Sequence, residues 1–351
     1  MLSILTIRIK KNGQALGAIV VLLGALATAM QSAAQTTPLI SGGMGFLTNT
    51  RGGNTSYIPV TSPLIAAPLG QHLLVEGRAT LFEDFNPKGG GQAGYNHSHY
   101  AALTYLQLAY FANSHMTVVA GEFLTPFGTY NERLTPIWIS NFQDVPLTMS
   151  LGNGTGSSVG GMLRGSAVSK PKFSIDYAAF YSAASSNQNF HSHNGWGGRT
   201  SIYIPQKRLE IGTSYARVPA VKPTNAIGAH VWWEPANSSF KLRSEYAHGT
   251  HAQGYWLETD YRFSNFGGAD TPLGRLEPVF RWQQTFRNSS GPGDNLPSAD
   301  TQRVDFGLDY HLPHEVRINT SYSRQLSSAG NLNIWQTGIV YRFLIPTWRG
   351  K

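Results

Sequence analysis

The stretch TQRVDFGLDYHLPHEVRINTSYSRQL, residues 301–326, contains two segments in which apolar and polar residues alternate. In the first segment, Val304 and Phe306 are interleaved with the charged residues Arg303 and Asp305. Successive side chains of a β-strand point to opposite faces, so each segment is predicted to be a strand with one apolar and one polar face. The turn sequence Leu-Pro-His-Glu between them predicts a hairpin.

A two-faced strand of this kind fits two architectures. In a soluble β-sandwich the apolar face packs in the core and the charged face meets water. In a membrane β-barrel the apolar face meets lipid and the charged face lines a lumen. Features elsewhere in the chain distinguish the sandwich from the barrel.

The N-terminus predicts export. Arg8, Lys10 and Lys11 precede an apolar run over residues 15–30, and small residues follow up to Ala34. This pattern predicts a cleavable signal peptide over residues 1–34 and a mature chain over residues 35–351. A permanent helical anchor is disfavoured because it needs about 20 apolar residues.

The composition favours a barrel for the mature chain. The 351 residues include 38 Gly and no Cys, and only 13% of them are charged. No later segment offers the run of about 18 apolar residues that a transmembrane helix needs. Because only helices and closed barrels satisfy every backbone group in lipid, a membrane location would require a closed barrel. The absence of Cys excludes disulfides and thiolate metal sites.

The two-faced pattern recurs along the whole mature chain. The expected strands are Pro38–Thr48, Tyr57–Ala67, Leu73–Phe85, Tyr100–Ala112, His115–Phe123, Ser158–Ser169, Lys172–Ala184, Trp196–Ile204, Arg208–Arg217, Ala226–Glu234, Phe240–His248, Gln253–Phe263, Arg275–Arg287, Thr301–Leu312, Glu315–Gln325 and Leu332–Phe343. Pro59 and Pro63 weaken the second strand because proline cannot donate to an interior ladder. The strand Tyr100–Ala112 is apolar on both faces, which suggests a subunit contact near Leu106 and Leu108.

The connections alternate in length. Short ones such as Asn113-Ser114 and Pro313-His314 are expected to alternate strictly with longer ones such as Asn86–His99. This alternation is typical of an up-and-down barrel with short periplasmic turns and longer external loops. The predicted fold is an all-β transmembrane antiparallel barrel of about 16 strands.

Charged residues occupy the face that such a barrel turns toward its lumen. The predicted pore-lining residues are Arg262, Arg275, Arg281, Arg287, Arg303, Arg317, Arg342, Lys241, Asp305 and Asp309. Fixed positive charge along a water-filled path would favour anions. Because acidic residues share these faces, cross-strand ion pairs that brace the wall are an equally open interpretation.

The long connection Leu124–Ser157 is the candidate constriction. It carries Glu132, Arg133 and Asp144 among aromatic residues and prolines. Loops of this length in compact structures are usually functional. An outward-packed lid or a trimer contact is the alternative.

The segment VVAGEFLTPFGTYNERLTPIW, residues 118–138, resembles the Gly-x-Phe-x-x-Pro-Phe-Gly region of the phosphate-selective porin O/P family. The last strands, including IWQTGIVYRF, resemble that family as well, with Tyr341 and Phe343 as the expected barrel-end signal. The resemblance implies a trimeric outer-membrane channel of 16 strands that uses cationic side chains to attract anions. The family's lysine-rich constriction has no counterpart here, because Lys241 alone among the lysines is clearly lumenal by the alternation. Phosphate therefore stays one candidate solute.

Two other patterns could indicate a metal site or an enzyme. The pairs His97/His99 and His191/His193 form His-x-His motifs, but no carboxylate or Cys is close to them in sequence, so no metal site and no cofactor are predicted. Residues 156–160 match Gly-x-Ser-x-Gly, yet that motif needs a strand–turn–helix elbow, whereas here it opens an antiparallel strand. No basic stripe suggests nucleic acid.

The sequence thus predicts a non-enzymatic outer-membrane porin that passes small hydrophilic solutes, with a preference for anions. Its expected partners are the lipid bilayer, small anions and two further copies in a homotrimer. The alternatives are a barrel that acts as an enzyme or adhesin without an open pore, and a soluble secreted β-sandwich or lectin.

Overall fold

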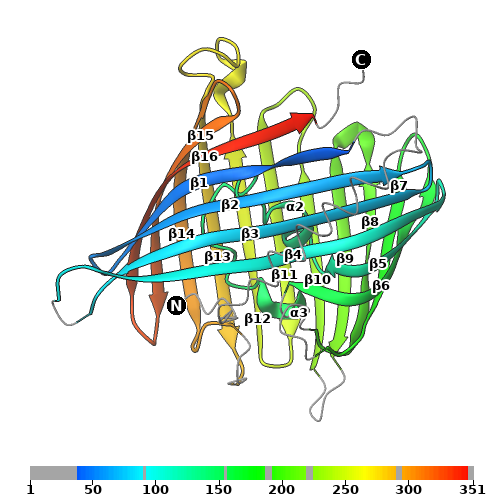
Figure 1. Ribbon diagram of the computed structural model, residues 1–351, viewed down its shortest axis with the longest axis horizontal. Coiled ribbons are helices and arrows are strands. Elements are labelled where there is room, and N and C mark those ends of the chain that lie inside the picture. The colour runs from blue at the N-terminus through cyan, green and yellow to red at the C-terminus, as the bar shows by residue number, and fades with distance from the viewer. Residues whose placement is uncertain are drawn as a thin grey trace.

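A computed structural model describes residues 38–89, 92–153, 156–185, 192–218, 224–289 and 295–346. The described chain forms one closed antiparallel barrel, in which consecutive strands are neighbours and β1 pairs with β16 (Figure 1). The predicted all-β barrel of about 16 strands is confirmed. The expected signal peptide, residues 1–34, lies outside the described residues.

The strands are β1 (Leu39–Arg51), β2 (Asn54–Leu69), β3 (Leu73–Pro87), β4 (Tyr95–Asn113), β5 (Met116–Leu124), β6 (Ser157–Ser169), β7 (Ser174–Ser182), β8 (Gly195–Ile204), β9 (Leu209–Val218), β10 (Thr224–Trp233), β11 (Phe240–Gly249), β12 (Ala252–Tyr261), β13 (Leu276–Arg287), β14 (Thr301–Leu312), β15 (Val316–Ser327) and β16 (Leu332–Pro346). Short helical turns are α2 (Tyr130–Arg133), α3 (Ser150–Asn153), η2 (Pro205–Lys207) and η3 (Phe263–Asn265). Within the described ranges, no helix has the length and apolar character needed to cross a membrane.

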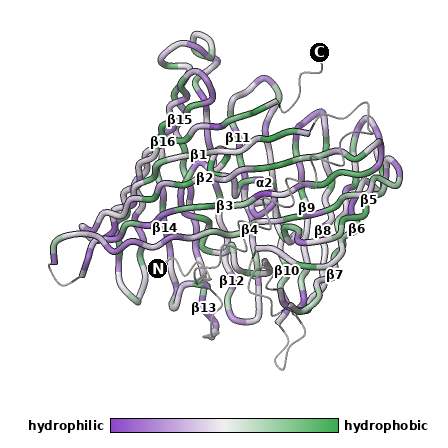
Figure 2. Tube along the Cα trace, in the orientation of Figure 1, coloured by the Kyte–Doolittle hydropathy of each residue, from purple (hydrophilic) through white to green (hydrophobic). Residues whose placement is uncertain are grey.

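The strand faces follow the alternation of the sequence. In β14, Arg303 and Asp305 face the lumen and are at most 3% exposed, whereas Phe306 on the outer face is 57% exposed. Figure 2 shows the same change of hydropathy from residue to residue along the strands. The outer surface is therefore apolar, as the sequence predicts for strands that contact lipid.

Strand β4, whose faces the sequence left undecided, has Leu108 and Tyr110 on its outer surface, 40% and 46% exposed. Gln107 lies on the other face and donates a hydrogen bond to Glu76 of β3. The inward face also contains Ala109, a small apolar residue that is buried. For this reason both faces of the strand look apolar in the sequence.

The prolines of β2 are accommodated by gaps in one ladder. Pro59 and Pro63 pair in register with Phe46 and Gly42 of β1. The register between β2 and β3 skips Ile58–Pro59 and Ser62–Pro63. A proline costs little where the neighbouring strand makes no hydrogen bond to its nitrogen.

The connections form two groups at opposite ends of the barrel. We call the end with the β2–β3, β4–β5 and β14–β15 connections the turn end, and the opposite end the loop end. The expected strict alternation in length is wrong at several places. At the turn end, residues 262–275 form a long β12–β13 connection. At the loop end, Gly52 and Gly53 alone join β1 to β2, and Thr250 and His251 alone join β11 to β12. Both glycines have positive φ, which allows so tight a turn.

The last strand is longer than expected. Strand β16 continues past Phe343 to Pro346, because Leu344, Ile345 and Pro346 still pair with β1. Tyr341 and Phe343 therefore lie within the strand rather than at its end. Their role as a barrel-end signal remains a prediction.

Candidate functional site

In the connection between β5 and β6, the described residues 125–153 and 156 fold into the lumen, and we call this segment the inner loop. Its residues Phe127, Tyr130 and Phe142 are at most 3% exposed. Figure 1 shows α2 and α3 of this loop within the outline of the barrel. The loop is the main body of buried side chains inside the barrel, so it determines how much of the lumen stays open.

Glu245 of β11 fixes the first part of the inner loop. Its carboxylate accepts hydrogen bonds from the Thr129 backbone N–H, the Thr129 hydroxyl (2.7 Å) and the Tyr130 backbone N–H (2.7 Å). These donors lie at the start of α2, where backbone N–H groups have no partner within the helix. Gly128, just before them, adopts a left-handed conformation with φ +64° and packs directly on Glu245.

Asp144 fixes the second part of the loop. Its carboxylate binds Arg51 of β1 at 2.8 Å and Arg303 of β14 at 2.7 Å, and its backbone carbonyl accepts a hydrogen bond from Arg281. Burial acts to raise the pKa of Asp144, but the charges of Arg303 and Arg51 outweigh it and hold that pKa below its ordinary value. The carboxylate is therefore charged at neutral pH.

Glycines on the lumenal face of the strands make room for the loop. A Cβ at Gly228 would lie 3.0 Å from the ring of Phe127, and one at Gly307 would lie 3.0 Å from the ring of Phe142. A Cβ at Gly43 would come within 2.5 Å of Trp138. These positions accept large loop side chains because they carry none of their own.

The predicted pore-lining residues fall into two groups. Arg281, Arg303, Arg317, Asp305 and Asp309 face inward on β13 to β15 and are at most 8% exposed. Arg262, Arg275, Arg287, Arg342 and Lys241 are more accessible: Arg262 and Arg275 lie in the β12–β13 connection, Arg287 ends β13, Arg342 lies near the end of β16 and Lys241 on β11.

The first group is joined by ion pairs beneath the loop. Arg303 binds Asp305 at 2.5 Å, and Arg281 binds Glu258 at 3.0 Å. Arg317 donates to the backbone carbonyls of Ile137 and Ser140 in the loop. These arginines are partly neutralised and covered. Ion pairs of this kind are what the bracing interpretation expects. The pore-lining interpretation expects accessible charges instead.

Lys241 belongs to the same wall, nearer the turn end. Its ammonium binds Asp260 at 2.9 Å and Glu277 at 3.0 Å, and Glu277 also contacts His311. Among the more accessible residues, Arg262 donates to the Gly274 carbonyl.

The opposite wall, formed by β3 to β8, leaves open space beside the loop. A cavity of about 440 Å³, which we call the side cavity, lies between this wall, the first strands and loop residues 132–139. Its described lining includes five arginines, namely Arg78, Arg133, Arg164, Arg199 and Arg342, and one acid, Glu132. The described lining therefore carries more positive than negative charge.

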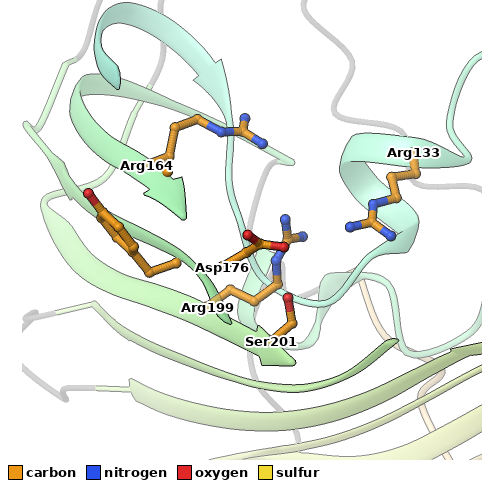
Figure 3. A pocket seen from close by; sticks show the side chains of 7 residues that line it. Arg133, Arg164, Asp176, Arg199 and Ser201 are labelled. Carbon is orange, nitrogen blue, oxygen red and sulfur yellow. The ribbon is translucent and has the colours of Figure 1, made fainter. Parts of the chain in front are cut away.

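A smaller cavity of about 250 Å³ adjoins it and shares three of these arginines (Figure 3). Arg133 reaches in from α2, Arg164 from β6 and Arg199 from β8. Glu132 pairs with Arg164 at 3.1 Å and with Arg199 at 2.7 Å, while Arg133 pairs with Glu210. The side chains of Arg133 and Arg164 nevertheless remain 35% and 41% exposed.

Sequence reasoning selected Glu132 and Arg133 but missed Arg78, Arg164 and Arg199. A signal was present for Arg164 and Arg199. Each is the charged residue of a lumenal face otherwise made of small or apolar residues, such as Met162 before Arg164 and Gly197 before Arg199. Of the two, the Arg164 side chain is 41% exposed, whereas that of Arg199 is 9% exposed.

The remaining sequence motifs do not converge on a catalytic or metal-binding arrangement. Glu83 contacts both His97 and His99, a carboxylate that the sequence spacing did not reveal. Within the described residues, no group of three or more His, Asp or Glu side chains is arranged to hold a metal. His191 lies outside them. Ser157 opens β6, as expected, and donates a hydrogen bond to Glu122 at 2.8 Å.

No protein-family model matches the sequence, and no curated protein matches it. Solved structures do share the fold. The anion-selective porin from Comamonas acidovorans has 11% identity and a TM-score of 0.56, over 88% of this chain and 100% of that one. OprB of Pseudomonas putida, solved at low pH, has 10% identity and a TM-score of 0.56, over 95% and 97%.

A loop L8 deletion mutant of OmpT, an outer membrane protein of Vibrio cholerae, has 11% identity and a TM-score of 0.54, over 88% of this chain and 99% of that one. The structural neighbours are thus outer-membrane porins. At these identities the likeness establishes the fold alone. The finer resemblance to the phosphate-selective O/P family is not confirmed.

Proposed function

We propose that this protein is an outer-membrane porin, a passive channel for small hydrophilic solutes with a preference for anions. One observation carries the proposal: the inner loop packs against the β9–β15 wall and leaves an arginine-lined cavity at the β3–β8 wall. Solutes that pass the loop on this side meet Arg133 and Arg164, whose side chains remain partly exposed.

The charge balance supports the anion preference. On the packed side, arginines lie within hydrogen-bond distance of acids, so their fields largely cancel, as for Arg303 with Asp144 and Asp305. On the open side, Arg164 and Arg199 share Glu132, Arg133 pairs with Glu210, and Arg78 has no acid partner among the described residues, so the lining keeps an excess of positive charge. Uncompensated charge beside a narrow aqueous path in a low-dielectric wall raises the local concentration of counter-ions.

Several finer features belong to the same proposal. Phosphate is one candidate anion, because guanidinium groups bind its oxygens in a bidentate geometry. Export by a cleaved signal peptide over residues 1–34 and assembly as a homotrimer follow from the sequence patterns and the family resemblance. The protein is expected to have no enzymatic activity and to need no cofactor.

The direct test is the reversal potential of the purified, folded protein in a planar bilayer under a potassium chloride gradient. We expect stepwise conductance and a reversal potential that favours chloride. The double variant Arg133→Gln/Arg164→Gln should shift that potential toward cation preference. Arg324→Gln serves as a matched control, because Arg324 is exposed on the outer face of β15 and pairs with Asn333.

Two results would overturn the proposal. Folded, inserted protein without conductance would reject the channel and favour an enzyme or adhesin. A wild-type channel that prefers potassium would reject the anion preference. Adding phosphate to the chloride solution then tests phosphate: a block at millimolar concentration would support it as a solute, and unchanged current would remove it.

A further inference from the structure

The side cavity is not uniformly polar. Besides its arginines it is lined by Leu39, Leu64, Trp138 and Ile139. Leu39 and Ile139 are 38% and 42% exposed, although they lie inside a barrel whose other inward side chains are mostly charged or small. Apolar surface that faces a water-filled lumen is unfavourable. Covering that surface with an apolar solute is favourable, because it removes the surface from water.

Arg78 supplies the second observation. It is 4% exposed, and within the described chain its side-chain contacts are one hydrogen bond of 3.1 Å to the Thr135 hydroxyl and the ring of Tyr105 at 5.4 Å. Its Nε has no hydrogen-bond partner. No carboxylate pairs with it in the parts of the chain that the structure describes. A buried guanidinium without an acid is unusual, because burying an unpaired charge is costly.

These two features lie side by side. Leu64 on β2 is the cross-strand partner of Arg78 on β3, and Arg78 is the partner of Tyr105 on β4. All three line the side cavity. Its apolar part therefore lies over the first strands, next to Trp138 and Ile139, and its basic part extends from Arg78 toward Arg164. One small solute can contact both parts at once.

We infer that the side cavity binds organic anions in which a single carboxylate is attached to a compact apolar body, such as an aromatic or branched aliphatic acid. The inference rests on the proposed porin function and specifies its substrate class. The carboxylate would accept hydrogen bonds from the partly exposed Arg164 and be attracted by the unpaired charge of Arg78, and the body would cover Leu64 and Ile139. A cavity of about 440 Å³ lies within the usual size range of small-molecule sites.

Inorganic phosphate fits the cavity less well. It would satisfy the arginines but leave the apolar surface of Leu39 and Ile139 in water. A neutral aromatic solute would cover the apolar surface but leave Arg78 unpaired. The combination of both surfaces selects for a solute that carries both chemical groups.

The test is the concentration of added solute that halves the single-channel chloride current. The probes are benzoate, acetate, phosphate and benzyl alcohol. We expect benzoate to block at a concentration about tenfold lower than acetate or phosphate, in line with the burial of one aromatic ring. Benzyl alcohol, which has the same ring without the charge, should not block in that range.

Two variants separate the two parts of the site. Ile139→Ser should raise the half-blocking concentration of benzoate by about fivefold and leave that of acetate unchanged. Val145→Ser is its matched control, because Val145 is 47% exposed in the same loop and lies outside the cavity lining. Arg78→Gln should weaken block by benzoate and by acetate together. Each variant is first checked for a folded, heat-modifiable barrel.

The outcomes are distinct. Equal half-blocking concentrations of benzoate and acetate in a chloride-preferring channel would overturn this inference and leave the proposed function intact. An equal effect of Ile139→Ser and Val145→Ser on benzoate would also overturn it. A folded barrel without conductance would overturn the proposed function itself.

Discussion

Asp144 of the inner loop and Arg303 of β14 form a buried ion pair, with 2.7 Å between Oδ2 and Nη1, although they are 159 positions apart in the sequence. Arg51 of β1 binds the same carboxylate at 2.8 Å. Asp144 thus connects the first strand, the loop and the last quarter of the barrel. Its side chain therefore holds the second part of the loop to both sides of the barrel seam.

Replacing Asp144 with Asn should loosen the inner loop. The change leaves Arg51 and Arg303 without their shared acid, at a cost of about 3 kcal/mol, the lower end for a broken buried pair, because Arg303 retains Asp305. We expect a lower denaturant midpoint and larger, noisier single-channel conductance. Asp270→Asn, in the exposed β12–β13 connection, is the control and should match the wild type. Quiet wild-type conductance in Asp144→Asn would contradict this role.

The same contact predicts a pH dependence. The pKa of Asp144 is lower in the folded protein than in the unfolded chain. The ionised Asp144 side chain therefore stabilises the fold fully above the ordinary Asp pKa of about 3.9. This stabilisation is lost as the pH falls through the lower pKa of the folded protein. The difference in stability between wild type and Asp144→Asn should therefore be constant from pH 7 to about 5 and shrink below about pH 4. Chemical denaturation across this range measures it. A difference that already disappears at pH 6 would refute the assignment.

Removing charge from the two walls should have unequal effects on ion selectivity. Arg164→Gln removes a side chain that is 41% exposed beside the side cavity, so the reversal potential should shift toward cations. Arg317→Gln removes one that is 10% exposed and bound to Asp309 and to the loop backbone, so it should lower stability and shift the potential less. Reversal potentials and denaturant midpoints of both variants test this. A larger potential shift in Arg317→Gln would restore the β13–β15 arginines as the main selectivity residues.

The strands and their faces could be predicted from the sequence because side-chain direction in a strand alternates with period two. Arg281 and Arg303 were assigned to the lumenal face, and they lie there. The alternation gives the face of a residue but not what covers it. No local pattern shows that Asp144 will cross the lumen to Arg303. The wall on which the loop packs therefore remained undetermined.

A partial signal for the packed wall does exist in the glycines. Gly228 and Gly307 occupy lumenal positions, and each faces a phenylalanine of the inner loop. An inward glycine in a barrel strand marks a place where another segment approaches closely. The arginine-lined cavity, by contrast, depends on tertiary packing of loop and wall together, which the sequence of either segment alone does not encode.

Filling one of these glycine positions should displace the loop. A Cβ at Gly43 would lie 2.5 Å from the Trp138 ring, so Gly43→Ala should move that indole and reshape the side cavity. We expect a changed tryptophan emission maximum and an altered conductance. Gly89→Ala is the matched control, because a Cβ there would meet nothing within 4 Å. Indistinguishable spectra and conductance in the two variants would show that the loop does not rest on β1 in this way.

The outer face of β4 is the expected subunit contact. Leu108 is 40% exposed there, and the chain has no native Cys, so Leu108→Cys introduces a single thiol. If β4 lies in a trimer interface, a bismaleimide cross-linker should join pairs of folded protomers extracted in mild detergent. Ile227→Cys on β10, which is 52% exposed on the outer face, provides the lipid-facing control and should stay monomeric on denaturing gels. Cross-linking at Ile227→Cys instead of Leu108→Cys would move the contact to β10, and cross-linking at neither position would argue against a contact through either strand.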